Sequence, residues 1–75
     1  MSQLKDLTAI IEREADGFVA LCPELDIASQ GDSVEEARRN LKEAVELFLE
    51  TADASEVQGR LSSEVYVTHL EVAIG

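Results

Sequence analysis

The chain has 75 residues, and at that length one two-layer domain buries about 60 to 65% of the surface of the unfolded polypeptide, so we expect a single domain over residues 1–75. Hydrophobic residues make up 45% of the sequence and charged residues 29%, a balance that excludes a disordered polypeptide. The net charge of −10 disfavours direct binding to nucleic acid or anionic membranes and favours a basic protein partner, although acidic surfaces also keep small proteins soluble.

The cysteine content and the N-terminus indicate a cytoplasmic protein. Cys22 is the only cysteine, so no disulfide can form within the chain. Residues 1–6 lack the basic and apolar regions of a secretory signal, and no run approaches the roughly 18 apolar residues that a membrane span needs. Because so small a core leaves stability marginal, we also expect a homo-oligomer, either a dimer or a tetramer.

The first part of the sequence predicts a β-hairpin. Residues 4–14 are rich in β-branched side chains, and Asp16 and Gly17 follow as a turn signal. The second arm, residues 18–22, is apolar at every position, which is typical of a strand with a helix on one face. Its other face is expected to be covered by a partner.

A loop and a short third strand should follow the hairpin. Pro23 has no amide hydrogen for a ladder and biases Cys22 away from helical angles, so we expect residues 23–26 to form the loop. Residues 27–30 are weakly apolar and predict a brief strand. Gly31 then supplies the permissive backbone expected where the chain turns into a helix.

A capping box marks the start of that helix. Ser33 is followed three positions later by Glu36, so the hydroxyl and the carboxylate can each satisfy an otherwise unpaired amide. Asp32 and Glu35 add negative charge at the positive end of the helix dipole. The apolar residues that follow at helical spacing predict a face packed on the sheet: Val34, Ala37, Leu41, Ala44, Val45, Phe48 and Ala52.

The remainder of the chain predicts a connecting loop over residues 51–63 and a final strand over residues 65–74. The element order β-β-β-α-β predicts an α+β fold of two layers, with one helix packed on one face of an antiparallel sheet. In the last strand the core-facing set is expected to be Tyr66, Thr68, Leu70, Val72 and Ile74. Elsewhere the predicted core includes Phe18, Leu21 and Leu41.

Side chains suited to catalysis or metal binding are few. His69 is the only histidine, and on an alternating strand a surface or interface role is favoured over that of a base. Cys22 has no neighbouring cation in sequence, so a buried structural thiol is favoured over a nucleophile. Glu24 and Asp26 form a weak pair of metal ligands with no histidine nearby. We therefore predict no enzyme and no catalytic, cofactor-binding or metal-binding residue.

Residues 17–50 resemble the HicB-like antitoxin family in its short, solitary form, which lacks the C-terminal DNA-binding domain. The resemblance implies a three-stranded sheet, a helix and a fourth strand in a partial RNase H-like arrangement without the catalytic carboxylates. The residues that carry it are Gly17 and Phe18, the corner Cys22, Pro23, Glu24 and Leu25, the stretch Ser29, Gln30, Gly31 and Asp32, and the helix positions Glu36, Ala37, Glu43 and Ala44.

The resemblance implies a protein-binding function in a type II toxin-antitoxin system, in which this domain blocks a small basic HicA-type ribonuclease. The chain departs from the family in two places. Many members carry a Pro-Gly-Cys corner before the third strand, where this chain has Leu25, Asp26 and Ile27. Complete members also continue into a DNA-binding domain, whereas this sequence ends at Gly75, so we do not expect operator binding.

Two other functions stay open. The chain is alternatively an orphan structural or regulatory domain that assembles with itself through an exposed sheet face, using either Val65 and Val67 or Val19 and Leu21. A small hydrolase that uses His69 with nearby carboxylates ranks far behind.

Overall fold

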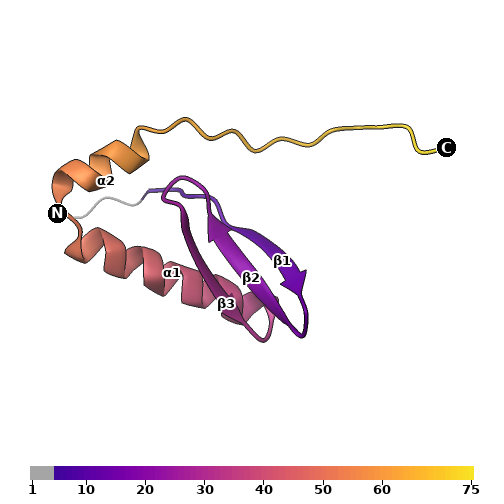
Figure 1. Ribbon diagram of the computed structural model, residues 1–75, viewed down its shortest axis with the longest axis horizontal. Helices are drawn as coiled ribbons and strands as arrows, with labels where there is room; N and C mark the ends of the chain where they lie inside the picture. Colours follow the sequence, from indigo (N-terminus) through magenta and orange to yellow (C-terminus); the bar gives the residue numbers. More distant parts are fainter. Residues whose placement is uncertain (1–4) are drawn as a thin grey trace.

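The structure is a computed structural model that describes residues 5–75 and contains three strands followed by two helices (Figure 1). The strands form one antiparallel sheet in the order β1-β2-β3, and α1 lies across one face. This confirms an α+β fold with the predicted hairpin, third strand and first helix; residue 4 of the predicted first arm lies outside the described residues. The elements are β1 (Ile10–Glu14), β2 (Gly17–Cys22), β3 (Ile27–Gly31), α1 (Val34–Thr51) and α2 (Ala54–Leu61).

Alternation along β2 decides which of its side chains face α1. Ala20 and Cys22 are fully buried on the helix side, whereas Leu21, between them, belongs to the opposite face and is only half-buried. The prediction that Leu21 lies in the core is therefore wrong, because successive side chains of a strand point to opposite faces. Leu41 is buried as predicted, and Phe18 packs at the margin of the core.

The core is thin because its fully buried members are mostly small. Half-buried apolar side chains pack around it from all three strands and both helices. A core of this size stabilises a lone chain weakly and favours burial of further surface. The buried residues are Ala20, Cys22, Leu25, Ala37 and Leu41.

The junction between β3 and α1 contains the predicted Ser33 cap, with the Glu36 carboxylate bonded one residue before the N-cap, at Asp32. The Ser33 hydroxyl accepts a hydrogen bond from the Glu36 amide at 3.0 Å, and the Glu36 carboxylate accepts one from the Asp32 amide at 2.9 Å. The predicted reason for Gly31 is wrong, since its φ is not positive. A Cβ added there would lie 2.5 Å from the backbone nitrogen of Ala37, so glycine is needed to let β3 approach α1.

The predicted loop after α1 is wrong, because α2 occupies it. Val57 and Leu61 are one helical turn apart and half-buried, and Leu61 packs against the core. Glu56 lies in the first turn and Arg60 in the last, in agreement with the helix dipole. The spacing of the two apolar residues and the placement of the two charges favour a helix in the sequence as well. Gly59 and the neighbouring serines favour a loop instead, so the local signals conflict.

The predicted fourth strand is not confirmed. Residues 64–75 pair with no strand of the sheet and run as an extended segment from the end of α2 past the sheet and away from the body (Figure 1). We call residues 64–75 the C-terminal segment. An alternating pattern of side chains indicates that a segment favours the extended conformation of a strand. A strand also needs hydrogen bonds to the backbone of a neighbouring strand.

Candidate protein-binding surface

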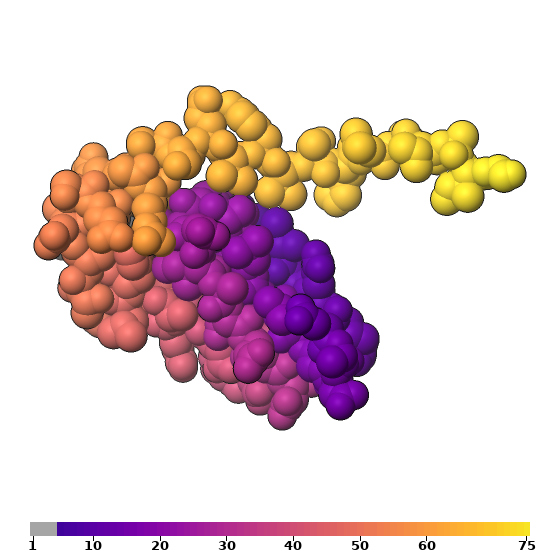
Figure 2. Space-filling model, in the orientation of Figure 1, coloured from indigo at the N-terminus to yellow at the C-terminus, as the bar shows by residue number. Residues whose placement is uncertain are grey.

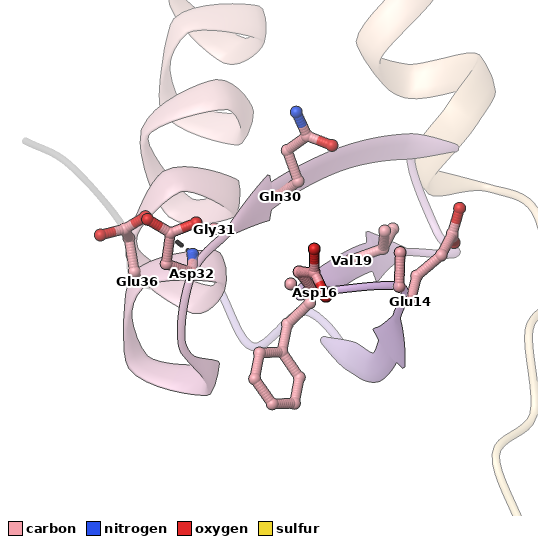
Figure 3. A pocket seen from close by; sticks show the side chains of 10 residues that line it. Glu14, Asp16, Val19, Gln30, Gly31, Asp32 and Glu36 are labelled. Atoms are coloured by element: carbon pink, nitrogen blue, oxygen red, sulfur yellow. Dashed lines mark hydrogen bonds between the residues drawn. The ribbon is translucent and has the colours of Figure 1, made fainter.

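A hollow of about 490 Å³ lies where the β1–β2 turn, the end of β3 and the start of α1 meet (Figure 3). Its apolar lining includes Phe18 and Val19 from β2. Its rim carries the carboxylates of Glu14, Asp16 and Asp32, and Figure 3 shows Asp32 on the side of α1 with Glu14 opposite. We call this feature the acidic hollow.

The backbone brings the two sides of the acidic hollow together. Ala15 and Asp16 form the turn between β1 and β2, and Ala15 adopts a left-handed φ of 53°. Gly17 therefore does not supply the left-handed residue of the turn. Its role is spatial, because an added Cβ would lie 2.9 Å from the carbonyl oxygen of Gly31. The two glycines let the hairpin sit close against the end of β3.

The carboxylates on the rim of the acidic hollow remain available to a partner. Among residues 5–75, the only ion pair within 4.0 Å joins Arg60 and Glu56, in α2. The nearby Arg13 guanidinium lies over the ring of Phe18, 4.6 Å from its centroid, and so covers part of that ring. The hollow thus offers unpaired negative charge beside an apolar lining, which suits lysine and arginine side chains of another protein.

The acidic hollow does not have the arrangement of a metal centre. Within the described part of the chain, no three His, Cys, Asp or Glu side chains are grouped so that they could hold a metal ion. One carboxylate of its lining, that of Glu36, already accepts a hydrogen bond from the Asp32 amide. What the hollow can do is recognise charge and shape.

A second depression, which we call the apolar groove, runs between residues 5–9 and α1. It measures about 370 Å³, and its apolar lining includes Leu41, Val45 and Leu49 from the helix and Leu7 from the other side. Charged side chains also line it: Lys5, Asp6, Arg38, Lys42 and Glu46. The groove lies beside the start of β1, at the margin of the sheet that α1 covers least. It offers apolar contacts next to an edge strand.

Glu24 ties the segment before β1 to the β2–β3 loop. Its carboxylate accepts hydrogen bonds from the Thr8 amide at 3.0 and 3.1 Å and from the Thr8 hydroxyl at 2.6 Å. The Cys22 thiol donates to the same carboxylate at 3.6 Å. Burial alone would raise the pKa of Glu24, but the hydrogen bonds from Thr8, from its own backbone amide and from Cys22 together outweigh burial and hold this pKa below its usual value.

Cys22 is the buried structural thiol that the sequence predicted. Its side chain is 1% exposed, and burial, reinforced by the neighbouring Glu24 carboxylate, raises its pKa. A raised pKa leaves less of the reactive thiolate at neutral pH. The thiol therefore contributes to packing and to the position of Glu24.

Two further sequence predictions concern His69 and the membrane. His69 is exposed within the C-terminal segment, and no hydrogen bond or ion pair joins it to another of the described residues. No helix in the described range is both long and apolar enough to cross a membrane.

The chain is similar in sequence to bacterial proteins of the UPF0150 family. The chain is 38% identical over 68 residues to a UPF0150 protein of Helicobacter pylori (strain J99), a match that covers 89% of the chain and 94% of that relative. It is 45% identical over 51 residues and 49% identical over 47 residues to two UPF0150 proteins of Synechocystis sp., and each match spans 65% of the relative. No family model and no solved structure matches the chain.

Proposed function

Because the chain belongs to the UPF0150 family, as its match to the Helicobacter relative shows, we propose one function for this small acidic fold. It is a HicB-like, antitoxin-type protein-binding domain that acts in the cytoplasm and neutralises a small basic HicA-type ribonuclease by direct binding. The resemblance of residues 17–50 to HicB-like antitoxins supports this assignment, and so does the three-stranded sheet covered by α1.

The acidic hollow is the observation that carries the proposal. Its rim places Glu14, Asp16 and Asp32 around an opening, in a chain whose net charge is −10. Complementary charge speeds the encounter with a basic partner and orients it on the surface. Val19 adds apolar area where contacts with the partner become dry, while Phe18 lies on the other face of β2 at the margin of the core.

RNA and this acidic protein would compete for the same cationic surface of the ribonuclease, and this competition accounts for inhibition. A small ribonuclease binds RNA through lysine and arginine side chains that contact phosphates. Carboxylates from the acidic hollow can occupy the same cations, and the attached domain then blocks the approach of RNA. No catalytic residue on this chain is required.

The test is a titration of a purified HicA-type ribonuclease with this protein, read out as binding and as RNA cleavage. Wild-type protein should bind and suppress cleavage. The charge-reversal pair Glu14→Lys with Asp16→Lys should raise the Kd about 10-fold or more, since it places positive charge against a basic partner. The matched control, Glu43→Lys with Glu50→Lys, makes the same charge change on α1 outside both depressions and should alter the Kd less than about 3-fold.

Either of two results would contradict the proposal. One is full ribonuclease activity in the presence of excess protein. The other is an equal loss of binding in both charge-reversal pairs, which would mean that net charge matters and the acidic hollow does not.

The second candidate function is an orphan domain that assembles with itself and has no toxin partner. One observation favours it, namely the C-terminal segment, most of whose apolar side chains are largely exposed. An oligomer that binds no ribonuclease would select this alternative.

A further inference from the structure

The chain exposes more surface than a compact protein of its size. Its radius of gyration is 14.5 Å, whereas a compact domain of this length has a radius of about 11 Å. Its accessible surface is 6358 Å², compared with about 4,500 Å² for a globular monomer of 8.2 kDa. Figure 2 shows the distal part of the C-terminal segment standing clear of the body.

The excess is large enough to form a stable interface. It amounts to about 1,800 Å² per chain, and each partner in a standard protein interface buries about 800 Å². A partner that covered the C-terminal segment would therefore bring the exposed surface back toward that of an ordinary globular protein.

The C-terminal segment has the chemistry of a strand that lacks a sheet. Apolar side chains at alternate positions share one face, and they are almost fully exposed: Tyr66 81%, Leu70 84%, Val72 72% and Ile74 95%. An extended backbone also leaves its amides and carbonyls free to pair. Addition of the segment to a second sheet would remove this apolar face from water. It would also give the backbone amides and carbonyls hydrogen-bond partners.

Among the described residues neither edge strand, β1 or β3, pairs with a further strand, and the β1 edge is the better suited to accept this segment. At β3, the Asn40 side chain of α1 donates a hydrogen bond to the Gln30 carbonyl at 2.8 Å, so the helix already engages that edge. At the opposite edge, β1 makes few contacts with α1. The apolar groove adjoins β1, and its partly exposed Leu7, Val45 and Leu49 side chains can receive apolar residues from an added strand.

We infer that residues 65–74 of one copy add as a fourth strand to the β1 edge of a second copy, and that the second copy returns the same contact. The apolar face of the segment packs beside the apolar groove, while its backbone pairs with β1. This inference goes beyond the proposed function and does not depend on it.

A second copy fits better than an unrelated protein, because each chain carries both halves of the contact. The C-terminal segment lacks a sheet and the β1 edge lacks a strand, so a two-fold exchange satisfies both at once and closes the assembly as a dimer. Within its own chain the segment leads outward past the sheet (Figure 1), and it does not lie along β1.

The test combines light scattering with hydrogen exchange on the full chain. Light scattering should give twice the chain mass of 8.2 kDa, and amides of both β1 and residues 65–74 should gain protection as concentration rises. Leu70→Asp should raise the dimer Kd roughly 100-fold or more, since each dimer contains two such changes. Protection should then fall in both segments, with an unchanged circular dichroism spectrum at high dilution.

Leu47→Asp is the matched control, because Leu47 is 60% exposed on α1 and lies outside the apolar groove. This variant should remain dimeric. The inference is overturned by a wild-type monomer, by a dimer whose C-terminal segment is unprotected, or by a monomer whose segment is protected through pairing with its own sheet. It is also overturned if Leu47→Asp dissociates the dimer and Leu70→Asp does not.

The dimer and the proposed function can fail separately. A dimer with a protected C-terminal segment that binds no ribonuclease would overturn only the antitoxin function. A monomer that inhibits the ribonuclease would overturn only the strand exchange.

Discussion

Glu24 accepts hydrogen bonds from both the amide and the hydroxyl of Thr8, and these bonds lower its pKa from the usual 4.5. Because the folded state favours the ionised form, this group contributes stability that is fully present above pH 4.5. The contribution is lost as the pH falls through the lower pKa of the folded state. Acid should therefore weaken the link between the segment before β1 and the β2–β3 loop.

The substitution Glu24→Gln should lower the free energy of unfolding by about 1 to 2 kcal/mol at pH 7, since it replaces charge-assisted hydrogen bonds with neutral ones. Urea denaturation of both proteins should show that this difference shrinks below pH 4.5. The control Glu12→Gln, at an exposed position in β1, should change stability by less than about 0.5 kcal/mol. A difference that is constant with pH would refute the role of ionised Glu24.

Gly31 and Gly59 provide a matched pair of glycines with opposite expected effects. A Cβ at Gly31 would lie 2.5 Å from the Ala37 nitrogen, whereas a Cβ at Gly59 would have nothing within 4 Å. Gly31→Ala should therefore lower the free energy of unfolding by about 2 kcal/mol or more, because β3 must move away from α1. Gly59→Ala should leave it unchanged or raise it by up to about 1 kcal/mol, since alanine favours the helix.

Thermal or urea denaturation of the two alanine variants gives the comparison directly. Equal stability would show that the backbone at Gly31 can shift without loss of packing. That result would contradict the close contact between β3 and α1.

At the scale of elements, α2 is attached to the body through Leu61, which packs against the core, and through Arg60. Its guanidinium donates to the Leu25 carbonyl in the β2–β3 loop and lies 4.7 Å from the centroid of the Phe48 ring on α1. It also pairs with Glu56 at 3.0 Å, a contact that is exposed and contributes little. Arg60 thus joins three separate parts of the chain.

Arg60→Ala should loosen α2 without unfolding the sheet and α1. Hydrogen exchange should show amide protection in α2 reduced about 10-fold or more, because a charge-assisted hydrogen bond and a cation–π contact are both removed. Protection in β2 should stay nearly unchanged. Arg39→Ala on the exposed face of α1 serves as the control and should leave α2 protected. Equal loss in both variants would refute the anchoring role.

At the scale of the whole molecule, the net charge has opposite effects on the homodimer and on the ribonuclease complex. Each copy carries a charge of −10, so two copies repel one another, whereas a basic ribonuclease is attracted. Added salt screens both interactions, because the Debye length falls from about 10 Å at 0.1 M to about 3 Å at 1 M. The two equilibria should therefore respond to salt with opposite signs.

Raising sodium chloride from about 0.05 M to about 0.5 M should lower the Kd of the homodimer and raise the Kd of the ribonuclease complex. Sedimentation of the protein alone and a binding titration at each salt concentration give the two values. A homodimer that salt dissociates would contradict an interface dominated by apolar side chains. A ribonuclease complex insensitive to salt would contradict recognition by the acidic hollow.

Local signals in the sequence predicted most of the fold. Ser33 and Glu36 marked the start of α1, Pro23 marked the end of β2, and alternation with the turn residues marked the hairpin. Each of these signals depends on residues a few positions apart, so it can be read without knowledge of distant contacts. By itself the sequence thus determined the order of the three strands and the first helix, and the acidic character of the surface.

Tertiary structure decided the features that depend on distant residues. Leu21 and Cys22 are neighbours with similar apolar character, and only the side on which α1 packs shows which of them is buried. Gly31 is required by a close approach that no local pattern reveals. The acidic hollow joins Glu14 to Asp32 across three elements, so their proximity was not predicted.

The C-terminal segment separates these two kinds of information most clearly. Its alternating side chains determined that residues 65–74 are suited to a strand, because that property belongs to the segment alone. Whether it pairs, and with which edge, depends on where α2 directs it and on which edge of the sheet stays open. Pairing is a relation between backbones, so only the tertiary structure could show that the segment extends away from its own sheet.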